Sequence, residues 1–170
     1  MSTIVNISLS SDSTLKHYGR QFNDAVNLLN VIIRKSSFRE LVNSFKYDWK
    51  HVDFQVEDAS VYEHLFVRKK MHEMQVHVRN SLGKFGRKST EILGTTVVGS
   101  PVTVVNEHWI SKLPLNCFHT VMALSAHLAH EYCHQLGFYD GKHTKQINVV
   151  PYYIGDLVYD FANDLFATQK

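Results

Sequence analysis

"SAHLAHEYCHQLGFYDGKH", residues 125–143, is the stretch of sequence on which the interpretation of this chain depends. Two of its four histidines, His130 and His134, enclose Glu131 in the pattern H-E-x-x-H. Residues four apart on a helix lie on the same face, one turn apart, so both imidazoles can reach one ion. Glu131 can hold a water molecule beside that ion without binding the ion itself. The stretch therefore predicts a metal site on a helix.

A catalytic zinc site needs three protein ligands and one open position, so a third ligand must be found. Gly137 is expected to end the helix and turn the chain back, and Asp140 follows three residues later. His143 lies on the same segment, and a carboxylate on the last predicted helix, Asp156 or Asp160, is a further alternative. We favour Asp140, because the glycine is explained only if the ligand follows it closely.

Chance is the alternative explanation of the motif. In a chain with 11 histidines, an accidental H-E-x-x-H arises in roughly one of thirty such sequences, and the fixed offsets of Gly137 and Asp140 lower that frequency by about two decades. His127, one turn before His130, is interpreted as a polar residue satisfied by a backbone carbonyl, since a fourth ligand would make the site structural. Cys133 is expected in the core.

The composition predicts one globular domain covering residues 1–170. Hydrophobic residues make up 44% and charged residues 20% of the 170 positions, and the formal charge is +2. This balance argues against nucleic acid as an obligatory partner, because proteins that bind nucleic acid usually have a clustered basic surface. No run approaches the roughly 18 apolar residues of a membrane span. With no visible secretory signal and only two cysteines, we expect a cytoplasmic protein, although release by lysis or dedicated export remains compatible.

Hydrophobic periodicity predicts an α+β domain. Ser37 with Glu40 and Ser60 with Glu63 have the spacing of capping boxes, and Asn116 is a candidate N-cap. Pro101 is expected at a sheet edge. The helices are predicted at 20–34, 37–45, 60–70, 117–136 and 155–170, and the strands at 4–9, 52–57, 74–78 and in a hairpin of 92–99 with 102–105, with a loop at 80–89.

The full spacing from His130 to Asp140, H-E-x-x-H-x-x-G-x-x-D, resembles the metzincin pattern of the zincin-type zinc metallopeptidases. In that group the last position is usually histidine, and the snapalysin-type enzymes use aspartate. "VPYYIG" at 150–155, after a "GF" at 137–138, is also similar to small uncharacterised zincin-like proteins of bacteria and their phages. This resemblance covers residues 93–156, with a weaker echo in "SSFRELVNSFKY" at 36–47, and most members have histidine where this chain has Asp140.

The resemblance implies a zincin-like domain with N-terminal helices, a small mixed sheet, a long H-E-x-x-H helix and a C-terminal helix. It implies a Zn²⁺ cofactor and an edge strand at 102–110, above the metal, that binds an extended peptide. An ordinary buried strand is the alternative for this segment. Where metzincins have a methionine-containing turn, this chain has Tyr152 and Tyr153, either of which can stabilise an oxyanion. A packing role for both tyrosines is the alternative.

The expected function is zinc-dependent hydrolysis of a peptide bond, with Glu131 as general base and a peptide or protein as substrate. The alternatives are a non-catalytic zinc-binding module and a partner-binding protein on a zincin scaffold. The sequence predicts neither the cleavage specificity nor the oligomeric state.

Overall fold

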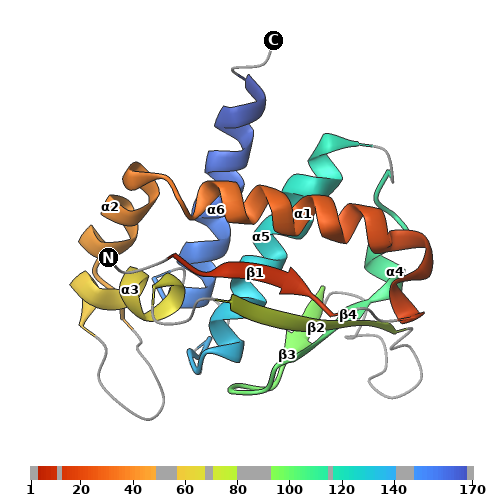
Figure 1. Ribbon diagram of the computed structural model, residues 1–170, viewed down its shortest axis with the longest axis horizontal. Coiled ribbons are helices and arrows are strands. Elements are labelled where there is room, and N and C mark those ends of the chain that lie inside the picture. The colour runs from red at the N-terminus through yellow and green to blue at the C-terminus, as the bar shows by residue number, and fades with distance from the viewer. Residues whose placement is uncertain are drawn as a thin grey trace.

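The computed structural model describes residues 4–10, 13–48, 57–67, 71–79, 93–114, 117–140 and 148–167. Helices and one small mixed sheet alternate along the chain (Figure 1), which confirms the predicted α+β class. The elements are β1 (Asn6–Leu9), α1 (Gly19–Ile32), α2 (Ser36–Ser44), α3 (Val61–Phe66), β2 (Met71–Arg79), β3 (Gly94–Thr96), β4 (Val102–Asn106), α4 (Glu107–Ile110), α5 (Phe118–Gln135) and α6 (Val150–Ala167), with 3₁₀ turns at Ser13–Tyr18 and Asp58–Ser60.

The sheet has the strand order β1-β2-β4-β3. The β1–β2 and β2–β4 pairs are parallel, and β3 and β4 form an antiparallel hairpin. The prediction that residues 102–110 form an edge strand above the metal is wrong, because β4 lies between β2 and β3 and residues 107–110 form α4. The edge strand that packs on α5 is β3.

Pro101 is tolerated for a reason other than an edge position. It precedes β4, so its missing N–H removes no hydrogen bond of the ladder. Its carbonyl still accepts from the backbone N–H of Gln75, at 3.1 Å. The proline thus marks where the strand begins.

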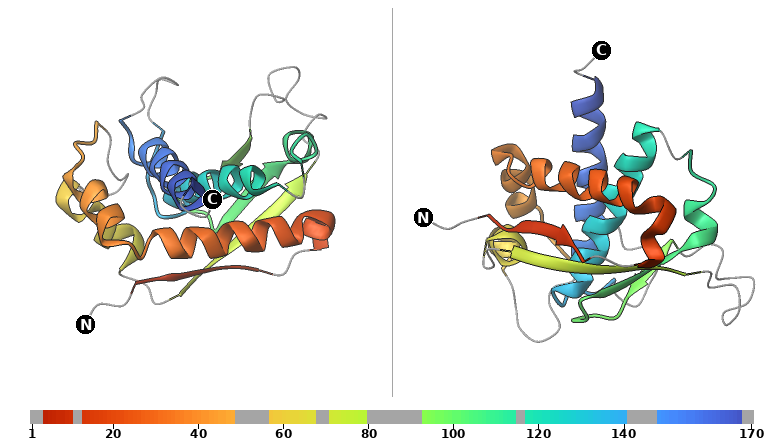
Figure 2. Two further views of the ribbon diagram at one scale, coloured as in Figure 1. Left: turned by 90° about the horizontal axis from the view of Figure 1, so that it is seen from above. Right: turned by 45° about the vertical axis from the view of Figure 1, so that its right-hand side comes forward.

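One face of the sheet is covered by helices. Along β2, Met74 and Val76 are fully buried whereas Glu73 and Gln75 are exposed, which confirms the predicted alternation of this strand. Helix α1 lies alongside β1 in the two orientations of Figure 2. Buried side chains of the strands therefore meet the helices in one hydrophobic core.

Helix α5 runs through the centre of the molecule, between α1 and α6. Gly155 of α6 allows a close approach, because a Cβ there would lie 3.2 Å from the carbonyl oxygen of Ala126 and 3.4 Å from the Cβ of His130. At the other end of α5, the buried amide of Gln135 donates to the Pro101 carbonyl at 3.0 Å and to the Thr103 hydroxyl at 2.9 Å. Helix α5 is thus fixed to α6 and to the β3–β4 hairpin.

Several predicted boundaries differ from the structure. Helix α6 begins at Val150 and not at residue 155, because proline is compatible with the first turn of a helix. Helix α2 begins at Ser36 and α3 after Ser60, and neither N-cap side chain makes a capping hydrogen bond, so both predicted capping boxes are wrong. Helix α3 ends at Phe66. The predicted strand at 52–57 lies, except for Glu57, outside the described residues, as do the loop at 80–89 and Asn116.

Within the described ranges, none of the helices has the length and apolar character that crossing a membrane requires.

Candidate metal centre

The end of α5 brings the candidate ligands together. Gly137 adopts a φ of 96°, a conformation that glycine reaches without strain. The N–H of Gly137 donates to the His134 carbonyl and the N–H of Phe138 to the Cys133 carbonyl, both at 3.0 Å, which is the Schellman pattern of helix termination. The chain therefore turns back over the last turn of α5 and carries Asp140 toward His130 and His134, as predicted from the glycine.

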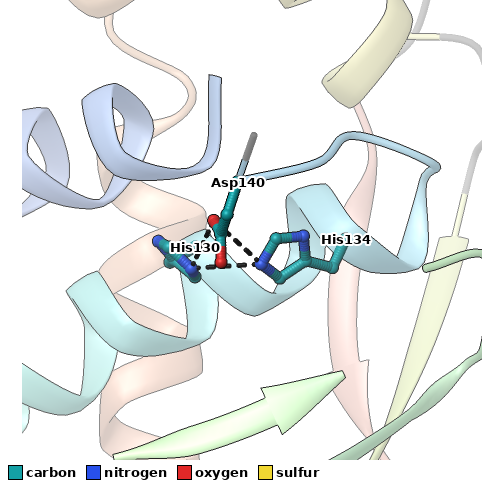
Figure 3. Close-up of side chains that lie close together, drawn as sticks. All are labelled: His130, His134 and Asp140. Carbon is teal, nitrogen blue, oxygen red and sulfur yellow. Dashed lines mark hydrogen bonds and ion pairs between the residues drawn. The ribbon is translucent and has the colours of Figure 1, made fainter. Parts of the chain in front are cut away.

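Three donor atoms converge at this place. Nε2 of His130 and Nε2 of His134 are 3.1 Å apart, and Oδ1 of Asp140 is 3.3 Å from each of them. Figure 3 shows the two imidazoles on successive turns of α5 with the carboxylate pointing between them. Within the described part of the chain, His130, His134 and Asp140 are the group of metal-binding side chains that lies close enough together to share an ion.

The distances fit a tetrahedral zinc site. Zinc–ligand bonds of about 2.0–2.1 Å that meet at the tetrahedral angle place the ligand atoms about 3.3 Å apart. The three observed separations, 3.1, 3.3 and 3.3 Å, lie close to that value. Two imidazoles and one carboxylate are also a donor set that zinc accepts, with a fourth position left open.

The orientation of His134 is fixed by a backbone carbonyl. Its Nδ1 lies 2.7 Å from the carbonyl oxygen of Phe138. Because a carbonyl only accepts, Nδ1 carries the proton, and in the neutral ring Nε2 presents its lone pair to the other two groups. Such a hydrogen bond from the distal ring nitrogen is the usual support of a metal-binding histidine. This role of the backbone carbonyl after Gly137 was not predicted from the sequence.

The electrostatics of the group favour a cation between the three side chains. Burial alone would lower the pKa of His134, but the hydrogen bonds to Asp140 and to the Phe138 carbonyl outweigh burial and raise it. Burial likewise opposes ionisation of Asp140, yet the two imidazoles hold the pKa of that carboxyl well below its usual range. The carboxylate is therefore ionised at neutral pH, and a proton or a metal ion must balance it.

Glu131 points elsewhere than the three donors. Its side chain is only 4% exposed, and Oε1 lies 3.8 Å from Nδ1 of the equally buried His127. In the described chain, Oε2 has no hydrogen-bond partner. The carboxylate is still near enough to His134 and to Tyr152 to contribute to raising the pKa of both. The Glu131 carboxylate thus lies next to the three donor atoms without being one of them, which is the position expected of the glutamate in this motif.

His127 is not a fourth ligand of this group, because its imidazole does not belong to the cluster. The prediction that a backbone carbonyl satisfies it is not met either, since its Nδ1 faces Glu131 and, among the described residues, its Nε2 has no partner. The i, i+4 spacing of His127 and Glu131 is the signal from which their contact could have been predicted. Cys133 is fully buried, as expected.

Of the two tyrosines, only Tyr152 lies at the cluster. Its ring packs edge-on against His130, with centroids 4.7 Å apart. Burial and the carboxylates of Asp140, Glu131 and Asp156 raise the pKa of Tyr152, so its hydroxyl remains a donor. Tyr153 instead stacks on Phe45 at 3.7 Å, and its hydroxyl faces the Leu41 carbonyl. The structure therefore does not bring Tyr153 to His130.

The other third-ligand candidates are not part of the cluster. Asp156 and Asp160 are exposed on α6, and neither belongs to the group that can share an ion with His130 and His134. His143 lies outside the described residues. Searches against protein-family models, curated proteins and solved structures find no match to this chain.

Proposed function

We propose that this chain is a zinc-dependent peptidase, with His130, His134 and Asp140 as zinc ligands and Glu131 as general base. The observation that carries this proposal is the convergence of three donor atoms at 3.1–3.3 Å from one another, at the spacing of a tetrahedral zinc site. Zinc bound there would act as a Lewis acid and bring the pKa of a coordinated water close to about 7.

The surrounding side chains have the chemistry that amide hydrolysis requires. Glu131 is a buried carboxylate with one oxygen that has no partner among the described residues, so that oxygen can take a proton from an attacking water and return it to the leaving amine. Tyr152 offers a protonated hydroxyl beside His130, which can donate a hydrogen bond to a carbonyl oxygen as negative charge develops on it.

Access to the site supports a catalytic role over a purely structural one. The side chain of Asp140 is 42% exposed, whereas those of His130 and His134 are 16% and 8% exposed. The group therefore opens to solvent on the side of the carboxylate. Three protein ligands with an accessible face are typical of catalytic zinc, while structural zinc is usually enclosed by four.

The test is the substitution Glu131→Gln, which preserves the shape of the side chain and removes its basicity. We expect elemental analysis of untagged protein to find about one zinc per chain in both the parent and the variant. Cleavage of a mixed peptide library should fall about 10²- to 10⁴-fold in the variant, which is the usual contribution of a general base. Glu73→Gln, on the exposed face of β2, controls for the loss of one carboxylate.

The outcomes separate the alternatives. A Glu131→Gln variant that cleaves peptides as well as the parent would refute the role of Glu131 as general base. Stoichiometric zinc without cleavage of any peptide would favour the non-catalytic zinc-binding module. Absence of zinc after refolding in its presence would remove the proposal altogether.

A further inference from the structure

His127 and Glu131 form a buried polar pair on α5 that the zinc ligands do not explain. Their side chains are 6% and 4% exposed, and Nδ1 of His127 lies 3.8 Å from Oε1 of Glu131. Within the described ranges, Nε2 of His127 and Oε2 of Glu131 have no hydrogen-bond partner. Buried polar atoms without partners are rare in folded proteins, and where they occur they call for an explanation.

The histidine ring is held in a closely fitting space. A Cβ at Gly94 of β3 would lie 2.4 Å from Nε2 of His127 and 2.9 Å from the carbonyl oxygen of Val104. Only glycine at this position therefore leaves room for the ring. The indole of Trp109 packs against the same imidazole, with ring centroids 5.7 Å apart. Contacts from the hairpin and from α4 thus restrict the ring to an orientation in which Nδ1 faces Glu131.

The protonation state is consistent with this orientation. Burial lowers the pKa of His127 to about 4, although Glu131 opposes the shift, so the ring is neutral at pH 7. A neutral imidazole carries its proton on one nitrogen, and the nitrogen that faces a carboxylate is the one that gains from carrying it. Nδ1–H is therefore the expected donor toward Oε1 of Glu131.

We propose that His127 is a positioning residue for Glu131, which holds one carboxylate oxygen by its Nδ1–H and leaves the other free to exchange a proton. The separation of 3.8 Å exceeds a direct hydrogen bond, and contacts of this kind commonly tighten when substrate is bound. The consequence for catalysis rests on the proposed function, whereas the contact and its tautomer do not.

The first experiment measures the tautomer of His127 in the full chain by long-range ¹H–¹⁵N correlation at neutral pH. We expect a protonated Nδ1 and an unprotonated Nε2. In Glu131→Leu the acceptor is lost, and the preference for Nδ1–H should disappear. A proton on Nε2 in the parent, or the same tautomer in parent and variant, would overturn the proposal. This measurement needs no enzymatic activity.

The second experiment compares His127→Asn with His127→Gln. Both introduce a neutral amide, but the shorter side chain of asparagine places its NH₂ near the position of Nδ1, and the longer glutamine places it near Nε2. We expect glutamine to lower kcat about 10- to 100-fold, as the loss of an orienting partner usually does. Asparagine should recover most of this loss, with KM and zinc content similar in both.

Equal kcat values in the two variants, whether both low or both at the level of the parent, would contradict a positioning role. Gly94→Ala should reproduce the effect of His127→Gln by displacing the ring, and Gly19→Ala, where nothing lies within 4 Å of the added Cβ, is its matched control. If the parent cleaves no peptide, the proposed function fails, and the tautomer alone decides on His127.

Discussion

Asn30 of α1 takes the hydrogen-bonding position that a further strand would occupy beside β1. Its Oδ1 accepts from the N–H of Ile7 at 2.9 Å and its Nδ2 donates to the carbonyl of Ile7 at 2.7 Å. Because β1 is the end strand of the sheet, this side chain closes an otherwise open edge.

We expect Asn30→Ala to lower the free energy of unfolding by about 1–3 kcal/mol, since both backbone groups of Ile7 would be left buried without a partner. Asn27→Ala, one turn earlier and exposed, should change it by no more than about 0.5 kcal/mol. Urea denaturation followed by circular dichroism measures both. Equal stability of the two variants would show that the Asn30 amide is dispensable.

Single residues also show how far the sequence could predict the site. The convergence of His130, His134 and Asp140 is seen in the structure and follows from two local features of the sequence. These are the helical spacing of the histidines and a glycine with positive φ. The contact of His127 with Glu131 follows the same helical spacing, whereas its close approach to Gly94, which is distant in sequence, could not be predicted from a local pattern. The choice between Tyr152 and Tyr153 depends on how α6 packs on its neighbours, which the sequence alone leaves open.

At the scale of elements, Glu63 joins α3 to α2. Its Oε1 accepts from Nε of Arg39 and its Oε2 from Nδ2 of Asn43, both at 2.8 Å. Partial burial would raise the pKa of Glu63, but these hydrogen bonds and the guanidinium charge outweigh burial and lower it. This tertiary pairing explains why Glu63 does not form a capping box with Ser60, as the sequence had suggested.

The lowered pKa makes this contact dependent on pH. Its contribution is fully present above the pKa of an unfolded glutamate, about 4.3, and is lost as the pH falls through the lower value of the folded state. We expect Glu63→Gln to cost about 0.5–1 kcal/mol at pH 7 and much less near pH 3. Urea unfolding at both pH values, with exposed Glu40→Gln as control, measures the difference. A cost independent of pH would exclude ionisation as its origin.

The positions of helices and strands along the chain were predicted better than the order of the strands in the sheet. Alternation located β2, and β-branched residues on either side of a glycine–proline turn located the hairpin. Apolar periodicity located α1 and most of α6, and Gly137 located the end of α5. The sequence placed residues 102–110 at a sheet edge, whereas β4 lies inside the sheet. Alternation of apolar and polar residues indicates which face of a strand is buried, and it contains no information on which other strands pair with that strand. Strand order is set by contacts between distant segments, so it could not be derived from the local pattern.

At the scale of the whole molecule, metal binding should contribute to stability. An ion present at about 100 times its Kd stabilises the native state by about 2.7 kcal/mol, which for a chain of this size raises Tm by about 5–10 °C. We expect that shift when zinc is added to protein stripped with a chelator, measured by scanning calorimetry. The shift should vanish in His134→Ala and persist in His17→Ala, an exposed histidine. An identical shift in both variants would place the ion elsewhere.

The terminal turn of α5 has a consequence for the order of assembly. All three donor atoms belong to one short run of the chain, residues 130–140, and the hydrogen bonds of the Schellman turn at Gly137 lie within the same run. Closing so short a loop has a small entropic cost and is fast compared with pairing distant strands. An ion that binds there, as proposed, would therefore find its three donor groups assembled early in folding, before the distant strands of the sheet have paired.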